Sequence, residues 1–257
     1  MALLDVRGAS KSFGRLRVLT NLTMSLESGA IDGVIGPNGA GKSTLFNLIT
    51  GVYRLDEGEI AFDGARIDRL ATYRVVRRGI ARTFQNLRLF GYLDAIENVL
   101  VGENPKLRAG LVESLLHSPS ERREERSARA RARELLAFVG FPRDSEEQFA
   151  RNLPYGVQRR LEIARALASQ PRLLLLDEPA AGMNPTEKDD LARLVRAIRD
   201  RGTTVLLIEH DMGLVMRLCE RITVLDYGEK IAEGTPASIR ADPRVVEAYL
   251  GPPDAAA

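Results

Sequence analysis

The chain has 257 residues, with 37 Lys and Arg against 35 Asp and Glu, one Cys and two His. A single cysteine excludes an internal disulfide framework and a multi-thiolate zinc site, and two histidines exclude a His-rich metal centre. Any catalytic metal is therefore expected to be a hard cation held by oxygen ligands, such as Mg²⁺. The formal net charge of +2 gives no reason to expect a nucleic-acid partner.

The N-terminal residues predict two antiparallel strands. Residues 3–6 and 18–26 are the apolar segments, and Phe13 and Gly14 lie between them at the expected turn. The next apolar segment, residues 31–35, is short and rich in branched side chains, which is typical of a buried parallel strand.

A glycine-rich segment follows residues 31–35 and precedes a helical pattern over residues 42–50. Its spacing in this context matches the phosphate-binding loop, because glycines let backbone N–H groups surround an anion and the helix N-terminus adds partial positive charge. Lys42 is expected to reach the outer phosphates of a nucleotide, and the Ser43 hydroxyl is expected to ligate Mg²⁺. The segment consists of Gly36, Pro37, Asn38, Gly39, Ala40, Gly41, Lys42, Ser43 and Thr44.

The middle of the chain predicts a change of architecture. A short strand over residues 81–84 is expected to end beside Gln85, where a polar amide is placed to sense metal or water. From residue 89 to about residue 150 helical patterns dominate, and residues 121–134 mix acids with six arginines, as on a solvated helix face. The sequence therefore predicts an α/β core that is interrupted by a helical insertion.

Two later apolar strands carry polar residues to the edge of the predicted sheet. Residues 173–176 lead into Asp177 and Glu178, and residues 205–208 are followed closely by His210. The carboxyl ends of parallel strands share one edge, so these side chains are expected beside the phosphate loop. Asp177 is expected to hold Mg²⁺ through water, Glu178 to act as general base for the attacking water, and His210 to contact the γ-phosphate.

Helical patterns over residues 186–199 and 212–220 complete an alternation of short strands and helices, which is typical of an α/β fold. The apolar segments reach only four or five residues, far below the roughly 20 that cross a bilayer. The sequence therefore predicts no membrane span and, by default, a cytosolic location. Residues 252–257 are predicted to be disordered.

Residues 153–167 resemble the signature motif of ATP-binding-cassette (ABC) ATPases, and the resemblance extends from Phe13 to about Gly251. It implies a P-loop NTPase fold: a RecA-like core, an N-terminal antiparallel β subdomain and an inserted α-helical subdomain. The implied cofactors are ATP and Mg²⁺. By the same resemblance Phe13 stacks on adenine, although core packing also explains it, Gln85 is the Q-loop residue that contacts metal and water, and His210 is the switch histidine.

The resemblance also implies an organisation within a single ABC ATPase domain, residues 1–257. The nucleotide-binding core with its β subdomain is expected at residues 1–88 and 160–235. The helical signature subdomain is expected at residues 89–159, and a C-terminal helical tail at residues 236–257.

Five motifs narrow the resemblance to the cassettes of branched-chain (hydrophobic) amino acid importers. This family implies two permease subunits, a second ABC ATPase subunit that is homologous or identical, and an extracytoplasmic substrate-binding protein. It also implies a peripheral location on the cytoplasmic face of the inner or plasma membrane. Residues 87–92 are the candidate permease contact, although core packing explains their apolar side chains about as well. The motifs are residues 81–86, 96–100, 177–185, 208–212 and 248–251.

The signature implies that two chains share each ATP, which lies between the phosphate loop of one chain and the signature of the other. A helix is expected to begin near Gln158, and backbone N–H groups of Tyr155, Gly156 and Val157 are expected to bind phosphate. Pro154 stands where the family has a serine whose hydroxyl touches the γ-phosphate, and Val157 replaces the terminal glutamine. Anion binding by this signature is therefore expected to be weakened.

Three other functions remain open from the sequence. The first is an ABC ATPase for another cargo, such as an amide, urea or lipopolysaccharide. The second is a soluble ABC protein that acts on DNA or ribosomes, but such proteins typically carry two cassettes or a long coiled-coil insertion. The third is a regulatory module without catalysis, which the combination of Asp177, Glu178 and His210 opposes.

Overall fold

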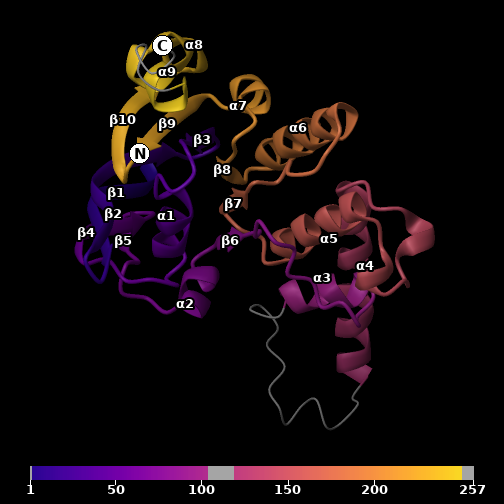
Figure 1. Ribbon diagram of the computed structural model, residues 1–257. Coiled ribbons are helices and arrows are strands. Elements are labelled where there is room, and N and C mark those ends of the chain that lie inside the picture. Colours follow the sequence, from indigo (N-terminus) through magenta and orange to yellow (C-terminus); the bar gives the residue numbers. More distant parts are fainter. Residues whose placement is uncertain (1, 104–118, 251–257) are drawn as a thin grey trace. The chain divides into compact units, whose positions relative to one another are not determined.

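The computed structural model describes residues 2–103 and 119–250 (Figure 1). These residues form two units: the first contains those up to Arg82 and from Arg172 onward, and the second contains those from Thr83 to Pro171. The segment expected to be a helical subdomain, residues 89–159, falls inside the second unit. The tail whose disorder the sequence predicts, residues 252–257, lies outside the described residues.

The larger sheet of the first unit has the strand order β10-β9-β3-β8-β7-β6. Neighbouring strands are parallel except for β9 and β10, which form an antiparallel hairpin at the sheet edge. Every residue of β3, β7 and β8 is buried, which confirms the parallel core strands predicted from the short apolar segments. The strands are β3 (Ile31–Ile35), β6 (Ile80–Arg82), β7 (Leu173–Asp177), β8 (Thr204–Ile208), β9 (Arg221–Asp226) and β10 (Glu229–Gly234).

The strand predicted over residues 81–84 ends earlier than expected, at Arg82. Beyond that point the Phe84 N–H donates to the Glu162 carboxylate, and the Phe84 carbonyl accepts a hydrogen bond from Arg159. Side chains of a later helix therefore satisfy this backbone in place of a neighbouring strand, which is why the strand does not continue.

The smaller sheet of the first unit is antiparallel, in the order β2-β1-β4-β5. Phe13 pairs with Leu16 across the turn at Gly14, which confirms the predicted hairpin, although both strands are longer than the apolar segments indicate. The sequence does not predict β4 and β5, which continue the sheet on the other side of β1. The strands are β1 (Ala2–Phe13), β2 (Leu16–Glu27), β4 (Glu57–Phe62) and β5 (Ala65–Arg66).

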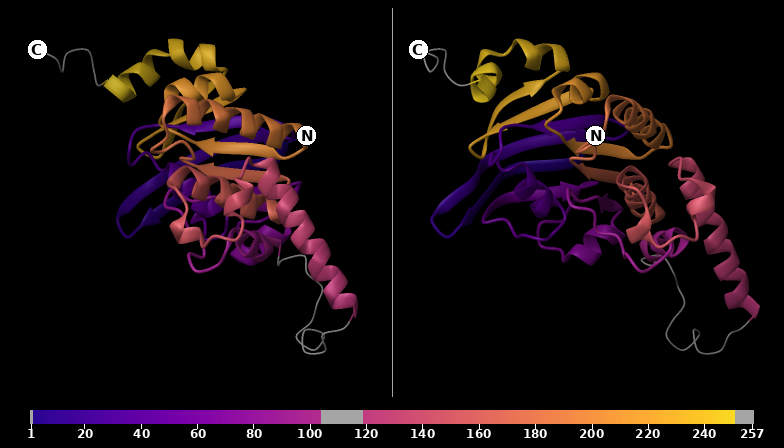
Figure 2. Two further views of the ribbon diagram at one scale, coloured as in Figure 1. Left: turned by 90° about the vertical axis from the view of Figure 1, so that its right-hand side faces the viewer. Right: turned by 45° about the vertical axis from the view of Figure 1, so that its right-hand side comes forward.

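Apolar side chains from both sheets and from α1 form one core in the first unit, in which Leu4, Val34 and Phe46 are at most 1% exposed. Burying a side chain of this size stabilises the fold by about 1.5–3 kcal/mol. Helices α8 and α9 pack against β10 (Figures 1 and 2). The helices of this unit are α1 (Lys42–Ile49), α2 (Thr72–Arg77), α6 (Pro185–Asp200), α7 (Met212–Leu218), α8 (Pro236–Ala241) and α9 (Pro243–Leu250).

Among residues 83–103 and 119–171, helices α3, α4 and α5 contact one another. At Gly102 a Cβ atom would lie 2.1 Å from the Arg165 carbonyl oxygen, so any side chain there would push α3 away from α5. An ion pair between Glu103 and Arg131 joins α3 to α4. The elements are α3 (Ala95–Glu103), α4 (Pro119–Phe138), η2 (Arg143–Ser145), η3 (Ala150–Asn152) and α5 (Tyr155–Ala168).

Helix α5 begins at Tyr155, with Pro154 as its N-cap, so the predicted start near Gln158 is wrong. The N–H groups of Val157 and Gln158 already donate to the Pro154 carbonyl, at N···O distances of 3.0 and 2.9 Å. Proline has no N–H to lose and its fixed φ suits the start of a helix, so the chain turns helical immediately after it.

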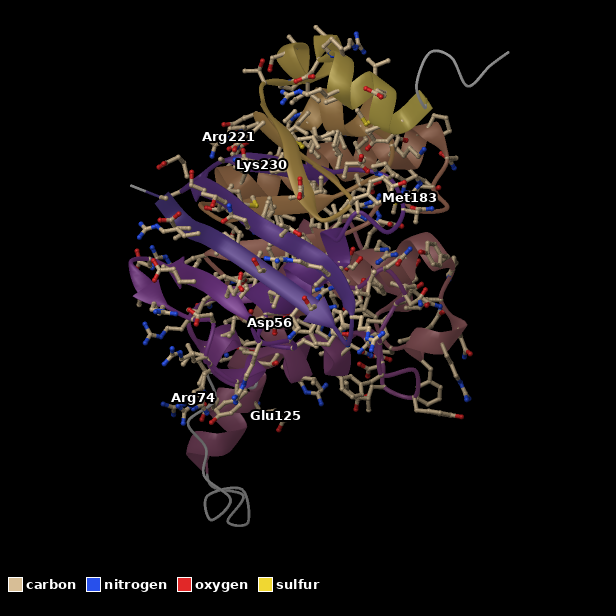
Figure 3. All side chains as sticks on the ribbon, turned by 60° about the vertical axis from the view of Figure 1, so that its left-hand side comes forward. Asp56, Arg74, Glu125, Met183, Arg221 and Lys230 are labelled. Atoms are coloured by element: carbon tan, nitrogen blue, oxygen red, sulfur yellow. The ribbon has the colours of Figure 1, made fainter. Side chains whose placement is uncertain are left out.

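A buried acid lies in the parallel sheet. Asp32 of β3 is in register with Arg221 of β9, and the Arg221 Nε atom lies 3.5 Å both from the Asp32 carboxylate and from that of Glu233. Lys230 also pairs with Glu233; Figure 3 labels Arg221 and Lys230. Burial raises the pKa of Asp32 to about 6, because desolvation outweighs the attraction of Arg221.

Within residues 2–103 and 119–250, none of the helices combines the length and the apolar character that crossing a bilayer requires.

Candidate nucleotide-binding site

The phosphate loop between β3 and α1 turns so tightly that two of its positions require glycine. Gly36 and Gly41 have φ values of 150° and 99°, which residues with a side chain rarely adopt. A Cβ atom would lie 2.0 Å from the Leu225 carbonyl oxygen at Gly36 and 2.8 Å from the Val18 carbonyl oxygen at Gly41. The loop therefore lies between β9 and β2, and its backbone N–H groups are the part that is available to bind a ligand.

Lys42 stands at the start of α1 and is buried. Its Nζ atom donates to the carbonyl oxygens of Gly36 and Pro37, at 2.6 and 2.9 Å, which closes the loop into a ring. Burial lowers the pKa of Lys42, and the nearby charges of Glu178 and Asp177 oppose that shift. The structure therefore brings Lys42 close enough to the predicted acids, Asp177 and Glu178, for their charges to act on it.

The N-terminus of α1 suits an anion. Its N-cap, Gly41, makes no side-chain capping hydrogen bond, so the N–H groups of the first turn are not satisfied by a side chain. Ser43 is exposed in that turn, and Asn38 and Gly39 are exposed in the loop before it. Exposed backbone, the positive end of a helix and a lysine together match the requirements of a polyphosphate.

The predicted acids follow β7 as expected. Asp177 is the last residue of the strand, and Glu178 turns the chain sharply, with a φ of 46° and an N–H that donates to the Ile208 carbonyl of β8 at 2.9 Å. The Nδ1 atom of His210, which follows β8, lies 3.7 Å from Oε2 of Glu178. Two strands distant in sequence thus place a carboxylate and an imidazole side by side.

Asp177 has a partner that the sequence analysis does not name. The Arg82 Nη2 atom donates to Oδ2 of Asp177 at 2.7 Å, and the two side chains are 8% and 5% exposed. Arg82 also donates to the side chain of Asn47, on α1, at 2.7 Å. Arg82 and Asp177 lie 95 positions apart in the chain, so only the β6–β7 pairing brings them together.

Glu209 is a second such residue, fully buried between β8 and His210. One carboxylate oxygen accepts a hydrogen bond from the Ala180 N–H at 2.7 Å, and the other accepts one from the His210 N–H at 3.2 Å. Burial raises the pKa of Glu209, and the backbone hydrogen bonds oppose this. The carboxylate links the loop after β7 to the loop after β8. An acid between an apolar strand and His210 is the sequence signal that could have indicated this link.

Magnesium fits the donors near the phosphate loop. The Asp177 carboxylate and the Ser43 hydroxyl supply oxygen atoms, which Mg²⁺ prefers. Among residues 2–103 and 119–250 there is no group of three or more His, Cys, Asp or Glu side chains arranged to hold a metal ion. Oxygen atoms of nucleotide and water would therefore have to complete the coordination of a metal ion here.

The other predicted site residues lie apart from this cluster or in the other unit. Phe13 is 41% exposed, and its ring packs edge-on against Tyr53 with ring centres 5.0 Å apart. Gln85 belongs to the second unit, three residues beyond β6, and its carbonyl accepts a hydrogen bond from Arg159 at 3.0 Å. The signature residues Tyr155, Gly156 and Val157 also belong to the second unit, at the start of α5.

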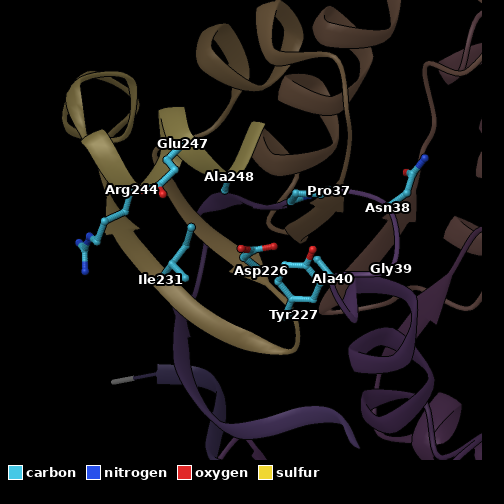
Figure 4. Close-up of a pocket in the computed structure, with 10 residues that line it drawn as sticks. All are labelled: Pro37, Asn38, Gly39, Ala40, Asp226, Tyr227, Ile231, Arg244, Glu247 and Ala248. Atoms are coloured by element: carbon cyan, nitrogen blue, oxygen red, sulfur yellow. The ribbon is translucent and has the colours of Figure 1, made fainter. Parts of the chain in front are cut away.

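A pocket of about 590 Å³ flanks the phosphate loop between the β9–β10 turn and α9 (Figure 4). Tyr249 of α9 lies beside the same loop: burial raises the pKa of its hydroxyl, and the Gly36 backbone opposes that shift. The C-terminal helix is thus in direct contact with the phosphate loop. The pocket residues are Pro37, Asn38, Gly39, Ala40, Asp226, Tyr227, Ile231, Arg244, Glu247 and Ala248.

Two family models match the chain. One, described as ABC transporter, matches residues 19–181. The other, described as branched-chain amino acid ATP-binding cassette transporter, matches residues 229–251. The second match covers β10, α8 and α9, the elements beside the pocket.

Similar proteins match almost the full length. The chain is 44% identical to the high-affinity branched-chain amino acid transport ATP-binding protein BraF of Pseudomonas aeruginosa and 45% identical to LivG of Escherichia coli K12. Each alignment covers 97% of this chain and 98% of the relative. A solved ATP-binding cassette of an ABC transporter in its ADP conformation has a TM-score of 0.85 and 32% identity, over 98% of this chain and 100% of that chain.

Proposed function

Since this chain belongs to the ABC transporter family as an ATP-hydrolysing subunit, we propose that it powers the import of branched-chain or related hydrophobic amino acids. The match of residues 229–251 to the branched-chain amino acid cassette model is the observation that carries this cargo. The relatives at 44% and 45% identity, named for the same cargo, support it. Transport of another cargo, such as an amide, urea or lipopolysaccharide, is the alternative that the experiment below decides.

In this proposal the phosphate loop binds ATP. Residues 36–44 surround the phosphates with backbone N–H groups, and Lys42 contacts the outer phosphates. Phe13, exposed at the end of β1, stacks on the adenine. The tight glycine turns at Gly36 and Gly41 support this role, because a side chain at either would collide with a neighbouring strand.

Hydrolysis is assigned to the residues that follow β7 and β8. Glu178 accepts a proton from the attacking water, and His210 contacts the γ-phosphate. The 3.7 Å separation of their side chains supports a shared task. Glu209 holds both loops in place through its hydrogen bonds to Ala180 and His210.

Magnesium, when bound, neutralises charge on the phosphates and polarises them for attack. Ser43, Asp177 and Gln85 are the residues that would hold it, with Asp177 acting through water. Their donors are all oxygen atoms of hydroxyl, carboxylate or amide groups, which fits this ion.

The active form is proposed to be a head-to-tail dimer with a second ABC ATPase, identical or homologous. At the start of α5, the backbone N–H groups of Tyr155, Gly156 and Val157 bind the ATP held by the partner. The N–H group of Val157 also donates to the Pro154 carbonyl. The dimer is placed at the cytoplasmic face of the inner or plasma membrane, on two permease subunits that receive cargo from an extracytoplasmic binding protein. Residues 87–92 are the proposed permease contact.

The decisive experiment combines purification with uptake. A tagged chain recovered from native membranes is expected to bring down two permease subunits and a second cassette. Deletion of its gene is expected to abolish uptake of labelled Leu, Ile and Val. Restoration is expected with the natural chain and with Glu229→Gln, an exposed substitution on β10, but not with Glu178→Gln. Normal amino acid uptake in the deletion strain, with loss of another cargo, would contradict the proposal.

A further inference from the structure

One guanidinium joins three elements of the first unit. Arg82, at the end of β6, donates from Nη2 to Asp177 of β7 and from Nη1 to Asn47 of α1, both at 2.7 Å. Its guanidinium carbon also lies 5.4 Å from the centre of the Phe46 ring. The planar fork of arginine serves both oxygen acceptors at once, which a lysine ammonium in this place cannot do with the same geometry.

This pair is buried, with exposed fractions of 8% for the Arg82 side chain and 5% for that of Asp177. A carboxylate removed from water requires a compensating charge and hydrogen bonds. Arg82 supplies both to Asp177. Asp177, the proposed metal ligand, is therefore already paired with the Arg82 guanidinium, whose position is fixed by Asn47 and Phe46.

We propose that Arg82 competes with the divalent cation for Asp177, and that it thereby sets the metal affinity of the site. The inference rests on the proposed role of Asp177 as a metal ligand. Arg82 is a positioning residue in this scheme, since it acts on metal through Asp177.

The direction of the effect follows from charge. The metal-bound water that donates to Asp177 either displaces the guanidinium or shares the carboxylate with it. Displacement costs the buried ion pair, and sharing places a cation close to another cation. Both routes weaken metal binding relative to a site without Arg82. The arginine in return balances the charge of Asp177 when metal is absent from the site.

The test measures Mg²⁺ affinity with the full chain saturated by fluorescent ADP, together with the melting temperature in EDTA. For Arg82→Met, which keeps a long apolar stem beside Phe46, the dissociation constant for Mg²⁺ is expected to fall about tenfold, equivalent to about 1.4 kcal/mol. Its melting temperature in EDTA is expected to fall as well, since the buried Asp177 carboxylate loses the positive charge and the hydrogen bond of Arg82. The conservative Arg82→Lys is expected to lie between the natural chain and Arg82→Met in both readouts.

The matched control is Arg172→Met, which removes an exposed arginine paired with Asp63 at 2.5 Å in the same unit. It is expected to leave Mg²⁺ affinity unchanged. Unchanged or weaker Mg²⁺ binding in Arg82→Met, or in Arg82→Lys if the first variant does not fold, overturns the inference. Asp177→Asn separates the two proposals: Mg²⁺ dependence that survives it removes the metal role of Asp177 itself, whatever the Arg82 variants show.

Discussion

At the scale of single residues, Asp32 shows what a buried charge costs this fold. Its folded-state pKa of about 6 stands above the ordinary value of 3.8 for an aspartate, so folding favours the protonated form. The contribution of Asp32 to the free energy of unfolding is largest below pH 4, and it is lost as the pH rises from about 4 to about 6. At neutral pH Asp32 is therefore ionised in the folded protein, and its burial lowers the free energy of unfolding even though Arg221 lies beside it.

Replacing Asp32 by Asn keeps the size and shape of the side chain and makes it neutral at every pH. Urea unfolding is expected to show Asp32→Asn more stable than the natural chain by about 3 kcal/mol at pH 7.5, and by about half of that at pH 5. The matched control is Asp63→Asn, because Arg172 lowers the pKa of the exposed Asp63 and no gain is expected there. A gain for Asp32→Asn that stays the same at both pH values would contradict the argument.

The sequence predicts some site residues and misses others for a physical reason. Lys42, Asp177 and Glu178 each carry a local signal, a glycine loop or an apolar strand that ends in acids, and the structure places their charges near one another. Their chemical roles stay predictions. Arg82 carries no comparable signal, and Glu209 carries only its place between an apolar strand and His210. The importance of both arises from pairing between segments distant in the chain, which one sequence does not reveal.

At the scale of elements, α9 is a helix distant in sequence from the phosphate loop that also lies beside it. The Tyr249 hydroxyl lies close enough to Gly36, the first residue of the phosphate loop, for that backbone to oppose the rise in pKa that burial causes. Loss of one neutral polar contact of this kind costs at most about 1 kcal/mol. Tyr249→Phe is therefore expected to lower the free energy of unfolding by that amount and to weaken ADP binding by up to about fivefold, as measured in urea and by titration.

The matched control is Tyr227→Phe, at the β9–β10 turn beside the same pocket, where the tyrosine is 89% exposed. This substitution is expected to change neither quantity. If Tyr249→Phe binds ADP as tightly as Tyr227→Phe does, the contact between α9 and the loop has no part in nucleotide binding.

Elements with strong periodic or apolar signals are predicted well, and their ends less so. The buried strands at residues 31–35, 173–176 and 205–208 are confirmed because short segments rich in branched apolar residues favour a parallel core, even where one of them contains Asp32. The predicted end of β6 is wrong because tertiary contacts decide it: Arg159 and Glu162 bind the backbone after the strand. The predicted start of α5 is wrong because the helix already begins after its N-cap, Pro154.

At the scale of the whole molecule, Pro154 bears on how ATP hydrolysis would be divided between the two sites of the proposed dimer. It caps α5 without a side-chain hydrogen bond, so the signature offers no hydroxyl at that position. One missing hydrogen bond to a charged phosphate costs about 1.5–3 kcal/mol. In the proposed dimer, the site to which this chain lends its signature is therefore expected to be weak, while the site at its own phosphate loop is expected to keep its activity.

If the partner is a different cassette, ATPase assays of the assembled transporter are expected to distinguish the two sites. Glu178→Gln in this chain should abolish most hydrolysis, and the equivalent substitution in the partner should remove much less. Equal losses from the two substitutions would refute this asymmetry. If the partner is an identical chain, both sites carry the same defect, and turnover of the assembled transporter is expected to be slow.

The place of Arg82 along the chain gives its contact with Asp177 a mechanical meaning. Arg82 is the last residue of the first unit, and the next peptide bond leads to Thr83, where the second unit begins. The chain passes between the two units twice, at residues 82–83 and at residues 171–172, and the residue that pairs with Asp177 stands at the first of these crossings. A guanidinium that changed partners at the proposed metal site would therefore act directly on the residue where the chain leaves the first unit.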